Sequence, residues 1–262
     1  MCHLGFGARG FCRMIKKTFS LLVLVVCAVF SVGAFQFTPL EQTFGTSGVD
    51  TQKTYTIVND SDEDIAVRIS VVDRDMDELG NEVRSQVSSN EFLVTPSQVI
   101  VRAQSAYVVR VRYRGPSVVT SEKAYRLIAE QVPYSTDASA DQSGAMFNFL
   151  YVYVTSLYVS PTREQVSVGI DAVAARVDED GSKVMDVTIR NSGNVHQILT
   201  RAKLTVHDSN GRSFVVSGSD SLAGIDGSNI LAKKTITKTI PWPSGLEFVE
   251  GGVYRGSLSY EK

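Results

Sequence analysis

The chain has 262 residues, and its 26 basic and 28 acidic side chains give a formal net charge of −2. Without a basic excess, the composition gives no electrostatic reason for binding nucleic acid. All three cysteines, Cys2, Cys12 and Cys27, lie near the N-terminus. The rest of the chain therefore has no disulfide and has to rely on its hydrophobic core.

The N-terminal segment has the three parts of a secretory signal peptide. Lys16 and Lys17 form a basic start, an apolar run follows over residues 19–30, and Val32-Gly33-Ala34 offers a small-residue cleavage site. The apolar run is too short to span a bilayer comfortably. We expect export to the periplasm, cleavage after residue 34 and no stable membrane insertion. The pattern begins at Met14, which is the expected true start.

From residue 35 on, runs of Val, Ile, Tyr, Phe and Thr alternate with polar residues, and turn clusters interrupt them, as in strands. The first set of predicted strands spans 54–59, 65–71, 92–95, 99–101, 106–113, 125–132 and 146–159. A polar loop over 135–144 precedes the last and longest of these strands. Pro161-Thr162-Arg163-Glu164 then breaks the pattern, and we place a domain boundary there.

The second set of predicted strands spans 166–175, 184–190, 199–207, 214–217, 234–240 and 252–260. Asp180-Gly181 and Asn210-Gly211 are typical of tight hairpin turns. Many short strands with almost no helical periodicity predict an all-β fold of two immunoglobulin-like β-sandwich domains in tandem. The expected division is a signal peptide over 1–34 and domains over 35–161 and 162–262. In outline, VTIRNSGN in the second half echoes YTIVNDSD in the first.

The expected mature chain carries no recognisable enzyme motif, cofactor motif or metal motif. His196 and His207 are its two histidines, and we interpret both as ordinary surface or turn residues. The stretch 73–77 (DRDMD) begins like a calcium loop. Glu78 and Arg84 stand where that loop needs glycine and glutamate, so an acidic, solvated hairpin is the better interpretation.

The stretch 108–133 (VVRVRYRGPSVVTSEKAYRLIAEQVP) resembles the PapD-like periplasmic pilus chaperones. That family has an arginine in a Val-Arg-Val strand, an acidic residue at the start of the next long strand, and a proline that closes it. Here these residues are Arg110, Glu122 and Pro133. The similarity is specific over about residues 92–161 and covers the rest of the mature chain in outline.

The resemblance implies a chaperone that lends its own long strand to pilin-like subunits that lack one, which is donor-strand complementation. Such a strand needs large apolar side chains that alternate along an exposed edge. We expect Phe147, Phe149, Tyr151 and Tyr153 to form that row. An ordinary core strand, apolar on both faces because both are buried, is the other interpretation.

The resemblance also assigns charged residues. Arg110, Glu122 and Glu250 match the family's interdomain charge cluster, for which we expect a structural role. The family holds the subunit's C-terminal carboxylate with two basic residues in the cleft. Thr43 and Ser156 stand at those positions here and are not basic. How a carboxylate would be held stays open at this point, with Lys53 or Arg163 as candidates.

The sequence therefore predicts a divergent periplasmic chaperone for pilin-like secreted subunits, with an outer-membrane usher as a further candidate partner. It predicts no catalysis, no cofactor and no nucleic acid. A structural or adhesive immunoglobulin-like surface protein is the first alternative, and the missing basic pair favours it. An enzyme or binding protein with a small ligand in the interdomain cleft is the second.

Overall fold

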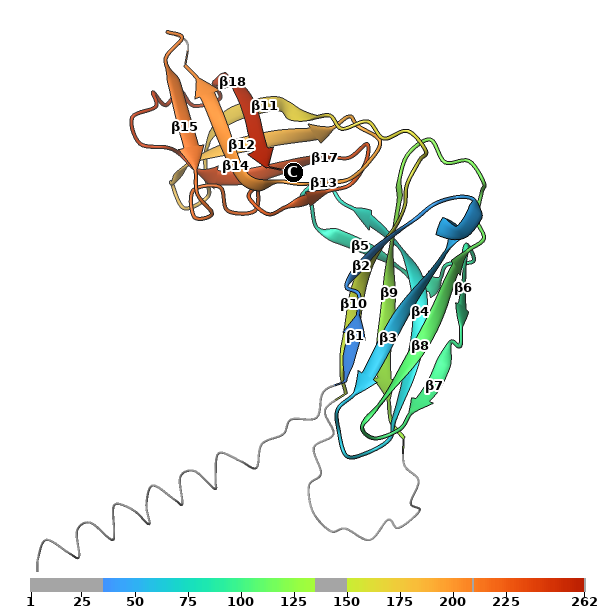
Figure 1. Ribbon diagram of the computed structural model, residues 1–262. Helices are drawn as coiled ribbons and strands as arrows, with labels where there is room; N and C mark the ends of the chain where they lie inside the picture. The colour runs from blue at the N-terminus through green and yellow to red at the C-terminus, as the bar shows by residue number, and fades with distance from the viewer. Residues whose placement is uncertain (1–34, 135–149, 209, 262) are drawn as a thin grey trace, which may run out of the picture.

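The computed structural model describes residues 35–134, 150–208 and 210–261. They form two β-sandwich domains that meet at an angle, so the molecule is bent (Figure 1). The predicted all-β fold with two immunoglobulin-like sandwiches is confirmed. The predicted boundary at residue 161 lies in the connection between the two sets of strands and stays a prediction.

Within the described residues, the N-terminal domain contains ten strands and one short 3-10 helix. They are β1 (Gln36–Thr38), β2 (Glu41–Phe44), η1 (Gly48–Thr51), β3 (Gln52–Asn59), β4 (Ile65–Met76), β5 (Glu82–Ser88), β6 (Phe92–Thr95), β7 (Gln98–Val101), β8 (Ser105–Tyr113), β9 (Lys123–Val132) and β10 (Val152–Val159). One sheet has the order β1-β3-β8-β6, and the other has the order β2-β10-β9-β4-β5, with β7 also paired to β4.

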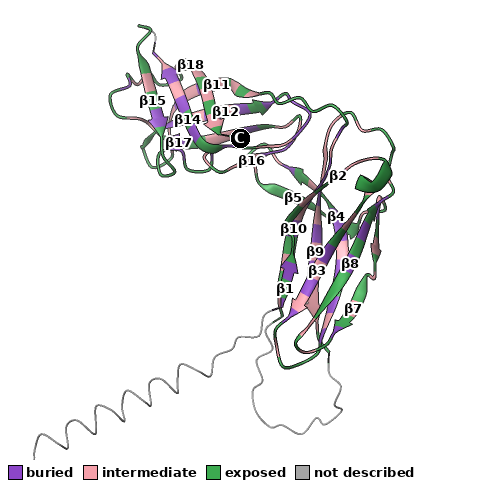
Figure 2. Ribbon diagram, in the orientation of Figure 1, coloured by how far each residue is buried: buried purple, intermediate pink, exposed green. Residues whose placement is uncertain are grey.

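Alternation along these strands builds the core between the two sheets, because successive side chains point to opposite faces. Tyr55 and Ile57 of β3 are fully buried, as are Val67 of β4 and Leu127 of β9. Figure 2 shows the buried residues on the faces where the sheets meet. Tyr55 and Ile57 therefore form the inward face of β3.

The C-terminal domain contains the other eight strands that the structure describes. They are β11 (Val168–Val177), β12 (Lys183–Asn191), β13 (Gln197–Ile198), β14 (Thr200–His207), β15 (Ser213–Ser217), β16 (Asn229–Ile230), β17 (Thr235–Pro241) and β18 (Val253–Glu261). The main sheet has the order β15-β14-β18-β11-β12-β17, and β13 pairs with β16. Gly256 is required where β18 passes β11, because a Cβ there would lie 2.7 Å from the Val173 side chain.

The sequence echo between the two halves reflects a shared structural device. Asn59 ends β3, and its Nδ2 donates to the carbonyls of Glu63, Val101 and Arg102. Asn191 ends β12, and its Nδ2 donates to the carbonyls of three residues in the same arrangement. These acceptors are Val195, Ile230 and Leu231. Each buried amide thus satisfies three backbone acceptors that would otherwise lack partners.

Glu91 joins the segment before β6 to the start of β9. Its carboxylate accepts hydrogen bonds from the Lys123 ammonium, at 2.5 Å, and from the Tyr125 hydroxyl, at 2.6 Å. A Cβ at Gly115 would lie 2.5 Å from the Tyr113 hydroxyl oxygen, so only glycine fits beside this cluster. Burial alone would raise the pKa of Glu91. The hydrogen bonds from Lys123 and Tyr125 outweigh it and lower that pKa below its usual value.

Replacing Glu91 with glutamine is expected to lower the free energy of unfolding at neutral pH by about 2 kcal/mol, because charged hydrogen bonds are lost. Since the folded-state pKa is lowered, this stabilisation is present above the unfolded pKa of Glu91. It disappears as the pH falls through the folded value. Urea unfolding across the acid range measures both effects. The difference between wild type and Glu91→Gln should shrink as the pH falls, and a constant difference would contradict this account.

Candidate functional site

One edge of the β2-β10-β9-β4-β5 sheet is open along part of β10. Strand β9 pairs with β10 from Val152 to Val159, whereas β2 covers only Ser156 to Val159 on the other side. Among the described residues, Val152–Thr155 therefore has no strand on its outer side. An uncovered edge offers backbone N–H and C=O groups for pairing with another chain, and proteins normally protect such edges.

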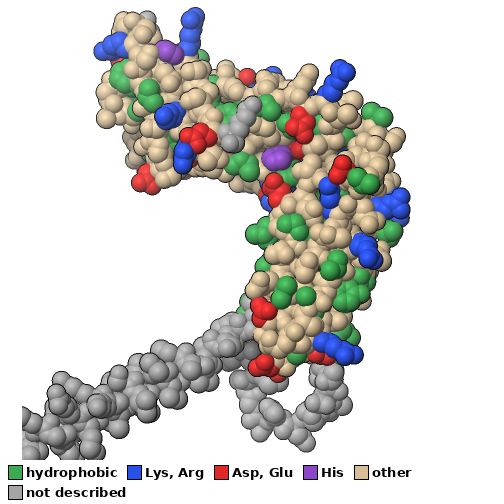
Figure 3. Space-filling view, in the orientation of Figure 1, with side chains coloured by type: hydrophobic (Ala, Val, Ile, Leu, Met, Phe, Trp, Pro, Cys, Tyr) green, Lys and Arg blue, Asp and Glu red, His purple; other side chains and the backbone are tan. Residues whose placement is uncertain are grey.

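The outward face of this edge is apolar. Leu150, Val152 and Val154 are 47%, 54% and 40% exposed. Ile128 stands opposite Val154 on β9 and is partly exposed on the same face. The open edge thus presents a row of aliphatic side chains at every second position. Figure 3 shows hydrophobic side chains (green) on the part of the N-terminal domain that borders the hollow between the two domains.

The structure corrects the predicted row. Tyr151 and Tyr153 pack against the core of the N-terminal domain. The Tyr153 ring lies 4.8 Å from the ring of Phe35, and its hydroxyl donates to the Phe35 carbonyl. Because side chains alternate, a shift of one residue exchanges the two faces of a strand. The prediction for these two tyrosines is therefore wrong, and the exposed row consists of aliphatic residues of the opposite parity. Phe147 and Phe149 lie outside the described residues.

Toward the domain junction the same face becomes cationic. Arg126 of β9 donates from Nη1 to the Ser156 hydroxyl at 2.6 Å and from its other nitrogens to Glu82. Glu82 also lies 3.0 Å from Nε of Arg74 and 3.1 Å from Nε of Arg84. Burial raises the pKa of Glu82, but the hydrogen bond and charge of Arg126, followed by the other arginines, lower it overall. Among the described residues, Glu82 is the one carboxylate that forms ion pairs with these three arginines, so cationic groups outnumber anionic ones in this cluster.

The structure places Thr43 and Ser156 on neighbouring strands, since Thr43 of β2 is paired with Tyr158 and Ser156 with Glu41. The basic group missed by sequence reasoning is Arg126, which stands opposite Ser156 on β9. Its signal was its place on the polar face of a strand, between the buried Tyr125 and Leu127. Lys53 is ion-paired with Asp50 instead.

The predicted charge cluster is corrected in part. Glu122 lies at the domain junction, where its carboxylate is 3% exposed and accepts from the backbone N–H of His196 and the Ser160 hydroxyl. Arg110 is exposed on β8, and Glu250 is exposed in the turn before β18. Among the described residues, no hydrogen bond or ion pair joins any two of Arg110, Glu122 and Glu250.

His196, which the sequence analysis treats as a surface residue, is instead part of the junction. Its Nδ1 lies 2.7 Å from the Glu122 carboxylate, and its ring stacks on Tyr158 at 3.9 Å. The Tyr158 hydroxyl accepts from Arg74 Nη1 and Asn229 Nδ2. Sequence reasoning could not find these contacts, because they join residues between 38 and 84 positions apart in the chain.

A comparison with protein families assigns the N-terminal domain. Residues 45–163 match the model described as the pili and flagellar-assembly chaperone, PapD N-terminal domain. The N-terminal domain is a PapD-like chaperone domain. The match begins just before η1 and includes the whole of β10, with its open edge. A search of curated proteins found no match.

Solved structures resemble the PapD-like domain together with the C-terminal domain. A chain of the CsuC–CsuE chaperone and tip adhesion subunit pre-assembly complex from Csu pili of Acinetobacter baumannii has a TM-score of 0.56 and 14% identity, with 81% of this chain and 90% of that chain covered. The class 5 fimbriae chaperone CfaA has a TM-score of 0.53 and 15% identity, with 84% of this chain and 97% of that chain covered. A chain of the Salmonella enterica SafA pilin–SafB chaperone complex has a TM-score of 0.51 and 14% identity, with 89% of this chain and 99% of that chain covered. At these identities the likeness shows the fold.

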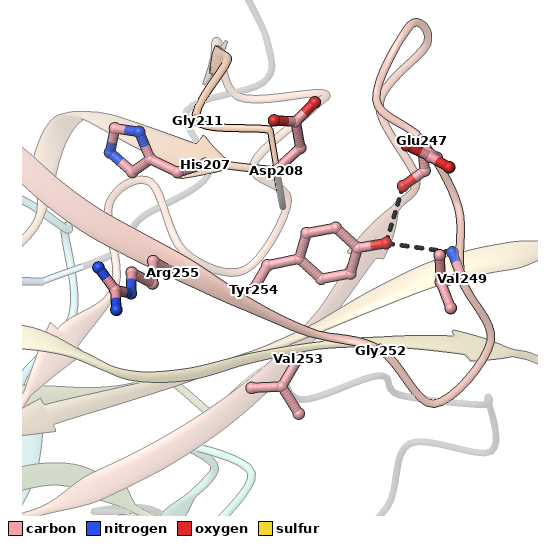
Figure 4. Close-up of a pocket in the computed structure, with 9 residues that line it drawn as sticks. All are labelled: His207, Asp208, Gly211, Glu247, Val249, Gly252, Val253, Tyr254 and Arg255. Carbon is pink, nitrogen blue, oxygen red and sulfur yellow. Dashed lines mark hydrogen bonds between the residues drawn. The ribbon is translucent and has the colours of Figure 1, made fainter.

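A cavity of about 810 Å³ lies outside the PapD-like domain. It lies in the C-terminal domain and includes His207, Asp208, Tyr254 and Arg255 in its lining. The Tyr254 hydroxyl donates to the Glu247 carbonyl and accepts from the Val249 backbone N–H (Figure 4). Within the described ranges, no group of three or more potential metal ligands gathers. No helix in those ranges is long and apolar enough to cross a membrane.

Proposed function

We propose that this protein is a periplasmic chaperone that binds pilin-like secreted subunits by adding the open edge of β10 to the subunit's incomplete sheet. The observation that carries the proposal is that no described strand pairs with the outer side of Val152–Thr155, where the row Leu150, Val152 and Val154 faces outward. In this mode, main-chain hydrogen bonds supply affinity and alternate side chains fill a groove in the partner.

Exposure of this edge is costly for a protein that works alone. An uncovered strand with aliphatic side chains invites aggregation, and natural proteins cover or charge such edges. Here the edge carries neither lysine nor proline from Leu150 to Thr155. A partner that covers the edge explains its retention. The binding would use no nucleotide, because completion of the subunit's sheet itself supplies free energy.

Arg74, Arg84 and Arg126 surround Glu82, and we call this cluster the arginine corner. It supports a second contact with the subunit. Arg126 and Arg74 lie at the junction end of the apolar row, and within the described part of the chain they share the single carboxylate of Glu82. A subunit carboxylate that reaches this corner would gain charge-assisted hydrogen bonds. It would have to share the arginines with Glu82 or displace it. Arg126 therefore replaces the basic pair that Thr43 and Ser156 lack.

Arg126→Ala is expected to weaken subunit binding about 10-fold, because a charged hydrogen-bond donor is removed from a partly buried site. The affinity should also depend less on salt concentration. Arg112→Ala, on the exposed face of β8 in the other sheet, serves as the matched control and should bind as wild type does. Titration calorimetry at two salt concentrations measures both quantities. Equal affinities for the two variants would remove the corner from the binding site.

The similar complexes support the choice of partner. The Acinetobacter baumannii and Salmonella enterica structures contain a chaperone with a tip subunit and a chaperone with a pilin. By analogy we propose a secreted pilin-like subunit here, with an outer-membrane usher as a later recipient. The proposal includes removal of the signal peptide after Ala34 and the two domains 35–161 and 162–262.

Capture of periplasmic proteins by the tagged chain, followed by amide hydrogen exchange on the purified complex, tests the proposal. A small β-rich subunit should be recovered, and the amides of Val152–Thr155 that face the open edge should become protected only in the complex. A complex in which these amides exchange as in the free chain would overturn the donor-strand mechanism. Failure to recover any subunit would favour a structural or adhesive surface protein.

A further inference from the structure

The hairpin between β4 and β5 belongs to the N-terminal domain but reaches the C-terminal domain (Figure 1). Met76, the last residue of β4, is 9% exposed and belongs to the hydrophobic cluster of the C-terminal domain. Asp75 forms an ion pair with Lys234 at 2.6 Å. The two domains are therefore connected by a second route besides the linker that follows β10.

The tip of this hairpin makes backbone contacts with β17. The N–H of Thr237 donates to the Glu78 carbonyl at 2.8 Å. The Lys238 ammonium donates to the Leu79 carbonyl. A Cβ on Gly80 would lie 3.0 Å from the Lys238 ammonium, and Gly80 has a φ of +77°. Glycine therefore permits both the turn and the close approach.

Strand β17 is the last strand of its sheet and, among the described strands, pairs only with β12. The backbone N–H of Trp242, just after β17, donates to the Lys183 carbonyl on the β12 side. The backbone N–H and C=O groups of even-numbered residues in β17 therefore point toward β12, and those of odd-numbered residues point outward. Of the outward positions, Pro241 has no N–H and Thr237 is bonded to the hairpin tip. The tip thus occupies the middle of an edge that could otherwise pair with another strand.

The hairpin tip is itself held in one conformation. Asp77 accepts from the backbone N–H groups of Leu79 and Asn81, at 2.9 and 2.7 Å, and from the Asn81 side chain at 3.0 Å. The Gly80 N–H donates to the Asp77 carbonyl. Because these hydrogen bonds hold the tip in one conformation, its contacts with β17 can fix the orientation of one domain relative to the other. A flexible loop could not do this.

We infer that the tip of the β4–β5 hairpin is an interdomain latch, which sets the bend of the molecule and covers the edge strand β17. Interfaces between domains of one chain commonly allow relative motion unless specific contacts prevent it. Thr237 and Lys238 are the positioning residues on the C-terminal side. This inference does not depend on the proposed function, because the latch joins the two domains in the free chain.

The test measures the bend directly in the full chain. Its three native cysteines are replaced by serine, and spin labels are attached to new cysteines at Val108 and Val215, which are 51% and 63% exposed and lie in different domains. Pulsed electron resonance then gives the distribution of distances between the labels. The double variant Thr237→Pro/Lys238→Ala should broaden this distribution at least about twofold, because proline removes the N–H but leaves the pairing with β12 intact.

A second variant guards against misfolding. Lys234→Ala/Lys238→Ala changes only side chains and should also broaden the distribution, though less. Lys203→Ala, on an exposed position of β14, is the matched control and should leave it unchanged. Sedimentation velocity should show concentration-dependent self-association of the Thr237→Pro/Lys238→Ala variant through the uncovered β17. Distributions that are equally narrow in wild type and both folded variants would overturn the latch.

Discussion

Val152→Arg is expected to reduce affinity for a captured pilin-like subunit by at least about 100-fold, because a charged side chain would have to enter an apolar groove. The same change should leave the fold intact, since Val152 is 54% exposed on the open edge. Affinity by calorimetry or surface plasmon resonance and thermal unfolding of the free variant are measured together.

Two further variants make this result specific. Tyr151→Arg lies one residue away but on the inner face, so it should lower stability more than Val152→Arg does. Ile100→Arg changes a side chain of similar exposure, 49%, on β7, and it should bind normally. If Val152→Arg binds normally, the outward face of β10 is not the contact surface. If Tyr151→Arg is as stable as wild type, the inward assignment of that face fails.

Asn191→Asp is expected to destabilise the C-terminal domain by about 3–5 kcal/mol, which is the range for an uncompensated buried charge. The amide of Asn191 is fully buried and donates to three carbonyls. A carboxylate in its place would face the same three oxygens with no proton to donate. Urea unfolding at neutral pH measures the loss.

The pH dependence of the stability of Asn191→Asp separates the effect of the buried charge from the effect of losing the amide hydrogen bonds. Burial beside carbonyl oxygens raises the pKa of the new carboxyl in the folded state, so the folded form binds more protons than the unfolded form at intermediate pH. Stability of Asn191→Asp relative to wild type should therefore recover as the pH falls. Asn191→Ala, which cannot titrate, should show no such recovery. Parallel pH profiles for the two variants would contradict this interpretation.

The sequence was sufficient for the fold and for the strand that carries the proposed site, but not for the face of that strand. Strand β10 reads as apolar on both faces, so periodicity alone could not tell Tyr153 from Val154. The deciding fact is that Phe35 and Phe37 lie within ring contact of Tyr153, which no local pattern shows. The larger rings occupy the core side, where burying them removes more apolar area from water.

The charged residues were harder still. A motif that matches a family fixes which residue types recur, but their partners come from distant segments. Glu122 does lie at the junction, yet its contacts are His196 and Ser160 rather than Arg110 or Glu250. Arg126 lies on β9, a third strand beside the one that holds Ser156, and the family pattern places no basic residue there. The corner depends on the lateral order of strands, and that order becomes visible only in the folded sheet.

Consecutive residues of β10 belong to different hydrophobic cores. Leu157 packs in the N-terminal core, and Tyr158 packs in the C-terminal one. Strand β4 is divided in the same way, since Ile69 and Met76 lie in different cores. Unfolding of either domain would expose side chains that are buried in the core of the other. Heat should therefore unfold the chain in one cooperative transition. A ligand that grips β10 would then raise the melting temperature of both domains together.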